Sequence, residues 1–126
     1  MQHAAANAYA AAAKHAQPPR ELEAALLIRA AHKLQSLVDD WSRADTELGP
    51  ALQYNGRIWS ILATSATEPT NPLPTPIKQS IAQLAVVIFQ RTYDVSEEPA
   101  PEKLGLLIRI NRDIAGGLRS QARAAA

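Results

Sequence analysis

The residue types that most often carry enzyme chemistry are few and scattered in this chain. Its 126 residues include no cysteine, which excludes disulfides, thiolate catalysis and cysteine zinc sites. All the histidines, His3, His15 and His32, lie in the N-terminal quarter. His32 follows Arg29 by one helical turn and adjoins Lys33, and no acidic residue at helical spacing would orient its ring. We therefore expect His32 to be a surface residue, not a general base or a metal ligand.

Paired carboxylates, another common source of acid–base chemistry, are also missing. Asp39 and Asp40 adjoin each other, so on a helix their side chains point in different directions. The sequence contains no phosphate-binding loop, nucleophile elbow or metal-spaced cluster. We therefore predict that the protein is not an enzyme, and we predict no catalytic, metal or cofactor-binding residue.

Charge and hydropathy argue against two classes of partner. The formal net charge is only +1, whereas a nucleic-acid-binding protein usually shows a clear basic excess. The basic group near the C-terminus has no aromatic platform beside it and indicates a solvated helix face: Arg109, Arg112, Arg119 and Arg123. The longest apolar run, Leu84 to Phe89, is far shorter than the roughly 20 residues of a membrane span. Because the alanine-rich start lacks a positive n-region, a signal peptide is not expected either. We expect a soluble cytoplasmic protein that makes no direct contact with nucleic acid or membrane.

Composition and hydrophobic period predict the elements that position any site. Alanine is abundant and glycine scarce, which favours helix. The chain length suits one domain. We predict an all-α fold, a compact bundle of four to five helices at about 4–16, 19–42, 50–66, 76–94 and 101–121. A polar connector, Ser42 to Glu47, precedes the third helix, and a proline-rich connector at 67–76 precedes the fourth.

The two ends of the chain are expected to be less ordered than the domain between them. Residues 1–17 form an alanine-rich N-terminal helix that would be marginal, and therefore mobile, in isolation. It is either a dangling terminus or a segment that folds onto a partner. We assign residues 18–121 to a single helical domain and residues 122–126 to a frayed tail.

Apolar residues at helical spacing identify the core faces of the second and third helices. The stripe of the helix at 19–42 comprises Leu22, Leu26, Ala30, Leu34, Leu37 and Trp41. In the helix at 50–66, Trp59 and Leu62 continue such a stripe and Asn55 falls on it. Gly56 beside it would let another backbone approach closely.

Two asparagines lie on seams that are otherwise apolar. Asn55 shares a seam with Trp59, and Asn111 lies between Leu107 and Ile114 on the last predicted helix. Either these amides hydrogen-bond each other or a backbone group and fix the helix register, or they line a partner groove.

The helix at 76–94 is apolar nearly all round. Ile77, Ile81, Leu84 and Ile88 form its regular stripe, while other faces carry further apolar residues. A bundle of this size has too few helices to cover all of them, and an exposed apolar patch marks an interaction site. The predicted partner-binding residues are Val86, Val87, Phe89 and Tyr93 from this helix, with Ile58 and Trp59 from the preceding one.

Three separate motifs, in order, resemble one known family. They are Asn55-Gly56-Arg57-Ile58-Trp59 followed by Leu62, then Asn71-Pro72-Leu73-Pro74, then Ile110-Asn111 with Ile114, Gly117 and Leu118. Over residues 9–119 the chain resembles the flagellar biosynthesis regulator FlaF family. That family typically shows an Asn-Arg-Arg-Leu-Trp-like helix, an Asn-x-Leu-Pro connector and an Ile-Asn-x-x-Ile-x-x-Gly-Leu ending. The resemblance implies structural roles for Asn55, Arg57, Trp59, Leu62, Asn71, Leu73, Pro74, Asn111, Gly117 and Leu118.

The resemblance also implies two classes of function. In the first, the protein is a chaperone that binds flagellin, shelters it before export by the type III secretion apparatus and supports flagellum assembly. In the second, it is a regulatory adaptor that controls flagellin mRNA translation through a partner protein such as FlbT, without holding flagellin itself. The near-neutral charge favours the first class over direct contact with RNA. The oligomeric state is not predicted from the sequence.

Overall fold

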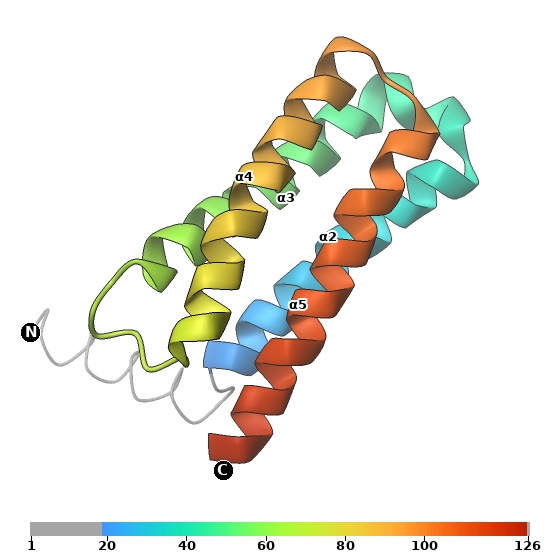
Figure 1. The fold of residues 1–126 in the computed structure, drawn as a ribbon. Coiled ribbons are helices and arrows are strands. Elements are labelled where there is room, and N and C mark those ends of the chain that lie inside the picture. Colours follow the sequence, from blue (N-terminus) through green and yellow to red (C-terminus); the bar gives the residue numbers. More distant parts are fainter. Residues whose placement is uncertain (1–18, 126) are drawn as a thin grey trace, which may run out of the picture.

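The computed structural model describes residues 19–125, and they form an all-α bundle, as predicted. Four α-helices occur in this range: α2 (Pro19–Asp39), α3 (Ala44–Ala66), α4 (Thr75–Glu97) and α5 (Leu104–Ala125) (Figure 1). The predicted helix at 4–16 and the predicted mobile segment 1–17 lie outside the described residues. Within residues 19–125 no helix is both long enough and apolar enough to cross a membrane.

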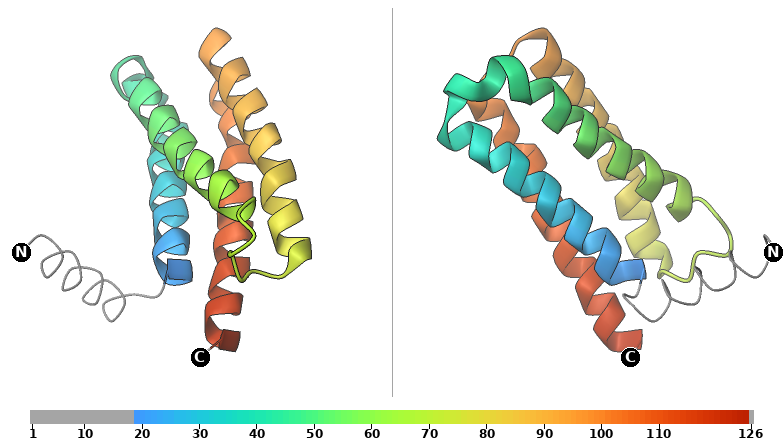
Figure 2. Two further views of the ribbon diagram at one scale, coloured as in Figure 1. Left: turned by 90° about the vertical axis from the view of Figure 1, so that its left-hand side faces the viewer. Right: turned by 180° about the vertical axis from the view of Figure 1, so that it is seen from behind.

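The helices pack in a definite order. α2 and α5 run antiparallel and form the most extensive pairing in the bundle. α3 packs on α2, α4 packs on α3, and α4 touches α5 at few residues. Figure 2 shows α2 and α4 on opposite sides of the molecule. α4 is therefore an edge helix, and part of its surface is left without a neighbour among the described helices.

The core lies between α2, α3 and α5, with one side of α4 closing it. Alanines on α2 (Ala24, Ala30 and Ala31) are fully buried, and their small side chains let α5 approach closely. The largest buried side chains are Trp59, Leu27, Leu34, Leu37, Ile81, Ile88, Leu104, Leu107 and Leu118. The predicted stripe of the helix at 19–42 is wrong at its first member. Leu22 is 48% exposed, because the buried face of α2 is centred on Leu27 and Ala31 instead.

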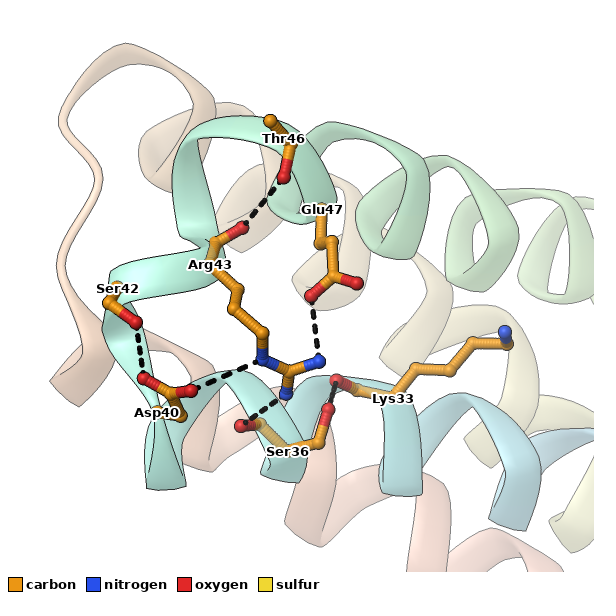
Figure 3. A network of polar contacts seen from close by, with 7 residues as sticks. All are labelled: Lys33, Ser36, Asp40, Ser42, Arg43, Thr46 and Glu47. Atoms are coloured by element: carbon orange, nitrogen blue, oxygen red, sulfur yellow. Dashed lines mark hydrogen bonds and ion pairs between the residues drawn. The ribbon is translucent and has the colours of Figure 1, made fainter.

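The predicted polar connector at 42–47 is wrong, since α3 begins at Ala44 and not at the predicted residue 50 (Figure 3). A 3-10 helix, Trp41–Arg43, leads directly into α3. The Arg43 guanidinium donates to the Ser36 carbonyl over 3.0 Å and pairs with Glu47 over 2.8 Å, which ties the start of α3 to the end of α2. Pro50 lies inside α3, where it removes one backbone hydrogen bond without ending the helix.

A second polar contact stabilises the same corner. The Ser42 hydroxyl donates to the Asp40 carboxylate, and this hydrogen bond is the main reason why the pKa of Asp40 lies below its usual value. The nearby Arg43 guanidinium acts in the same direction. Local polar groups therefore stabilise this corner, in addition to the packing of Trp41 and Ala44 against the core.

The proline-rich connector is held by Asn71. Its side-chain amide donates to both the carbonyl and the hydroxyl oxygen of Ser65 over 3.0 Å, and its Oδ1 accepts the Leu73 backbone N–H over 2.9 Å. This Asx-type turn buries the Leu73 side chain in the core. Pro74, with ψ of 143°, is the extended residue that precedes α4. The hydrogen bonds of Asn71 and the burial of Leu73 therefore explain why these two residue types occur in the connector.

The remaining helix ends differ modestly from the prediction. α4 continues to Glu97, beyond the predicted residue 94. A 3-10 helix, Pro101–Lys103, precedes α5 at the predicted start of the last helix. Lys103 joins this corner to α4 through Asp94, at 3.3 Å, and through the Glu98 carbonyl, at 2.8 Å. α5 continues to Ala125, so the helix extends into the segment 122–126 that was predicted to fray.

Candidate functional site

A buried hydrogen-bonded cluster joins three helices at the centre of the bundle. The Asn111 amide donates to Asn55 Oδ1 over 2.7 Å and to the Leu27 carbonyl over 3.3 Å. Asn111 Oδ1 accepts the indole N–H of Trp59 over 2.8 Å. Both asparagines and Trp59 are fully buried. The prediction that the asparagines bond each other and set the helix register is confirmed, because α5, α3 and α2 meet in this one cluster.

This cluster corrects part of the predicted partner surface. Trp59 and Ile58 were expected to contact a partner, but both side chains are buried in the core. The indole N–H of Trp59 is already bonded to Asn111, so neither its ring nor its polar atom faces solvent. Leu62 and Leu118 are buried as well, which fits the structural role that the family motif implies for them.

A groove with a volume of about 690 Å³ lies between α3 and α4. Its lining is mostly apolar or small, and comprises Gly49, Leu52, Gln53, Gly56, Arg57, Ser60, Ile61, Phe89, Thr92 and Ser96. A smaller depression of about 340 Å³ shares Ser60 and Ile61 with it and continues past the end of α3 to Glu68. Together they form an elongated feature of the kind that accepts an extended or helical segment.

Two large apolar side chains stand at the walls of this groove. Ile61 on α3 is 67% exposed, and Phe89 on α4 is 41% exposed. The α3 wall also carries Gly49 and Gly56, where an added Cβ would meet no atom within 4 Å. Within residues 19–125 no backbone approaches Gly56 closely, because this glycine lines the open groove. The predicted close approach of another backbone therefore stays a prediction for an occupant of the groove.

The groove carries a single sign of charge. Arg57 is its one charged lining residue, and among residues 19–125 it forms no ion pair. An occupant with a carboxylate near one apolar face would therefore meet complementary charge. Arg57 was assigned a structural role from its motif, but the structure places it on the surface.

The predicted partner residues on α4 fall on two different faces. Val86, 55% exposed, Phe89 and Tyr93, 69% exposed, follow one another at steps of three and four residues and lie on one side of the helix. Ala82 extends this side by one turn and is also exposed. Val87 is exposed too, but it is rotated by about 100° from Val86, on the side away from the groove. We refer to Ala82, Val86, Phe89 and Tyr93 as the α4 stripe.

A second cavity, of about 460 Å³, lies at the corner between α2 and α3. Its charged lining residues Arg43 and Glu47 are paired with each other, and Lys33 lies over the Tyr54 ring at 5.0 Å from its centroid. The Tyr54 hydroxyl is buried there and has no hydrogen-bond partner among the described residues. Because the charged groups are already paired, we interpret this cavity as part of the corner that fixes α2 against α3.

The other predicted polar groups lie apart from the groove. Arg109 and Arg112 are exposed on α5, and Arg119 pairs with Glu21 over 3.5 Å. His32 is exposed on α2, as predicted. Gly117 is exposed, and a Cβ added there would meet no atom within 4 Å. Within residues 19–125 no group of three or more His, Cys, Asp or Glu residues could hold a metal ion.

Sequence reasoning did not identify Ile61 or Gly49 as parts of a site. Ile61 flanks the core stripe of α3 in the sequence, but Arg57 and Thr64, at helical spacing from it, are both exposed, as is the adjacent Ser60. A large apolar residue on an otherwise polar helix face is the signal that could have revealed it.

Comparison with known proteins gives one match. The model of the family described as "Flagellar protein FlaF" matches residues 5–118, which is most of the chain. The comparisons with curated proteins and with solved structures found no match.

Proposed function

The chain belongs to the flagellar protein FlaF family, and from this premise we propose that it is a flagellin-binding chaperone of the cytoplasm, not an enzyme. It shelters flagellin before export and so supports flagellin synthesis and flagellum assembly. The observation that carries the proposal is the open groove between α3 and α4, with Ile61 and Phe89 exposed at its walls. A protein of this size has no structural need for exposed apolar side chains at a groove.

The chemistry of the groove suits an amphipathic helix. Its α3 wall carries no side chain at Gly49 and Gly56, so the backbone of a bound helix can come close there. Ile61 and Phe89 provide anchors for apolar side chains on that helix, and Arg57 provides one charge at the rim. Flagellin segments that are amphipathic and poorly ordered before assembly are the kind of cargo that such a site would hold. Covering their apolar faces would prevent premature polymerisation.

Co-elution separates this function from the adaptor alternative. The full chain is expressed together with flagellin and the mixture is passed over a sizing column at micromolar concentration. We expect the two proteins to elute as one complex. Elution apart from flagellin would contradict the proposal. Co-elution with FlbT, in a second run with FlbT in place of flagellin, would then favour control of translation through that partner.

A second experiment tests the prediction that the protein does not bind nucleic acid directly. The isolated protein is titrated with flagellin mRNA at low and at physiological salt. We expect no binding, because the protein has a near-neutral charge and no aromatic platform accompanies its arginines. Tight binding that weakens steeply with salt would overturn this expectation.

A further inference from the structure

The α4 stripe extends well beyond the groove. Phe89 lines the groove, but Ala82, Val86 and Tyr93 do not. Among residues 19–125 nothing packs on these exposed side chains, because α4 is the edge helix of the bundle. The stripe repeats at steps of four, three and four residues, which is the spacing of a helix–helix seam. A groove-binding segment would therefore leave a second, flatter apolar surface on the same helix.

We propose that the α4 stripe binds a second copy of this chain. The two α4 helices run antiparallel, and the two-fold axis between them crosses the stripe midway between Val86 and Phe89. In this register Val86 lies opposite Phe89 of the second copy, and Ala82 lies opposite Tyr93. Each layer thus pairs a smaller with a larger side chain, which fills the seam evenly. The same surface serves both copies, as a two-fold interface requires.

Charge along α4 favours the antiparallel arrangement. Lys78 lies near the start of the helix, whereas Asp94 and Glu97 lie near its end. Asp94 pairs with Lys103, but Glu97 has no ion pair among the described residues. The antiparallel register brings Lys78 of each copy to the level of Glu97 of the other, while a parallel register would place the acidic ends together.

Little charge opposes association along the rest of the stripe. Between Lys78 and Asp94 the one charged residue of α4 is Arg91. Its guanidinium donates to the Lys103 carbonyl over 3.1 Å, which directs it toward the start of α5. The polar residues that flank the stripe, such as Gln83 and Gln90, are neutral amides that can bond each other across a seam.

This pairing has a consequence for the site, which rests on the proposed function. Phe89 belongs both to the groove and to the stripe, so cargo in the groove and a second copy on the stripe compete for it. Without cargo, the dimer covers apolar surface that would otherwise promote aggregation. Binding of flagellin should therefore shift the protein from dimer to monomer.

Disulfide trapping tests the register directly, since the chain has no cysteine of its own. We mix Ala82→Cys protein with Tyr93→Cys protein and oxidise them without flagellin. The mixture should form a cross-linked dimer. Ala82→Cys alone should form little, because its two copies would lie about 16 Å apart along the seam, beyond the reach of a disulfide. Arg112→Cys on α5 is the matched control and should remain uncross-linked. Equal cross-linking of Ala82→Cys alone and of the mixture would overturn the proposed register.

Sedimentation equilibrium of the full chain alone tests the association itself. We expect a monomer–dimer equilibrium in the micromolar range, loss of the dimer in Val86→Glu, and an unchanged dimer in Ile61→Gln. Circular dichroism should show unchanged helix content in both variants, because both side chains are more than half exposed. A wild-type chain that stays monomeric throughout would overturn the proposal. That outcome would leave the proposed function standing, since flagellin is absent from the experiment.

Discussion

At the scale of single residues, the hydrogen bonds of Asn111 explain why a polar residue occupies an apolar seam. This amide satisfies Trp59, Asn55 and the Leu27 carbonyl at once, and so joins α5 to both α3 and α2. Asn55 contributes less, because its own Nδ2 has no partner among the described residues. A buried network of this kind stabilises one packing arrangement and penalises a shift in register.

Replacement of Asn111 should therefore be costly. We expect Asn111→Ala to lower the free energy of unfolding by roughly 1–3 kcal/mol, since it leaves the Trp59 indole N–H buried without an acceptor. Asn55→Ala should cost less. Urea denaturation measures both, with the exposed neighbour Arg112→Ala as the control, expected to stay within about 0.5 kcal/mol of the wild type. An Asn111→Ala protein as stable as that control would contradict the role of the cluster.

Glu23 makes the stability depend on pH. Burial raises its pKa above the usual 4.5, and Arg20, 3.8 Å away, offsets part of that effect. Below pH 4.5 the carboxyl is neutral in both the folded and the unfolded state and carries no penalty. As the pH rises through the folded-state pKa, ionisation inside the protein destabilises the fold.

Glu23→Gln should therefore raise the unfolding temperature at about pH 7 and leave it nearly unchanged at about pH 3.5. Thermal melts followed by circular dichroism measure the difference at each pH. Glu21→Gln, on the same helix but in a partly exposed ion pair with Arg119, is the matched control and should show no such gain. If Glu23→Gln raised the unfolding temperature more in acid than at neutral pH, the predicted direction of the pH dependence would be wrong.

At the scale of the elements, the connector decides where α4 lies. Asn71 closes the turn with its side chain, and Leu73 anchors it in the core, so two residues of an eight-residue segment fix the start of an edge helix. Because α4 packs mainly on α3, its position depends on this connector more than on contacts with α5.

We expect Asn71→Ala to loosen α4 selectively. Loss of its three hydrogen bonds should cost about 1 kcal/mol overall, while amide exchange near Ile77 and Lys78 should accelerate more than exchange in α2 or α5. Hydrogen exchange with peptide resolution measures this. Thr70→Ala, in the same connector but exposed, is the control. Equal acceleration in all four helices would indicate that the connector acts only on global stability.

The elements also show which features the sequence could predict. Helical period and composition predicted the all-α fold class and the helices within residues 19–125. They also predicted the buried faces of α3 and α5, because an apolar stripe on a helix packs against a neighbouring element. The period predicted the α2 stripe less well, since many alanines fit more than one face. The start of α3 was missed because Pro50 resembles a helix start, whereas the contacts of Arg43 extend the helix past it.

At the scale of the whole molecule, the groove itself could not be predicted. Trp59 was predicted both as a partner contact and as a structural residue, and its burial fits the structural role alone. Its hydrogen-bond partner Asn111 is 52 positions away in the chain. Likewise, the exposure of Ile61 depends on where α4 stops covering α3. Both outcomes follow from tertiary packing, which a helical period does not specify. The exposed apolar face of α4, by contrast, was predicted from the sequence, because the predicted bundle has too few helices to cover all sides of α4.

The central claim is that flagellin is held in the groove between α3 and α4, and Ile61 tests it most directly. This side chain lines the groove, is 67% exposed and lies outside the α4 stripe, so Ile61→Gln should leave both the fold and self-association unchanged. Calorimetric titration with flagellin should show binding at least about tenfold weaker than for the wild type. Leu22→Gln, which alters a similarly apolar and exposed residue on α2, should bind like the wild type. Equal affinities for wild type, Ile61→Gln and Leu22→Gln would contradict the assignment of the groove as the flagellin site.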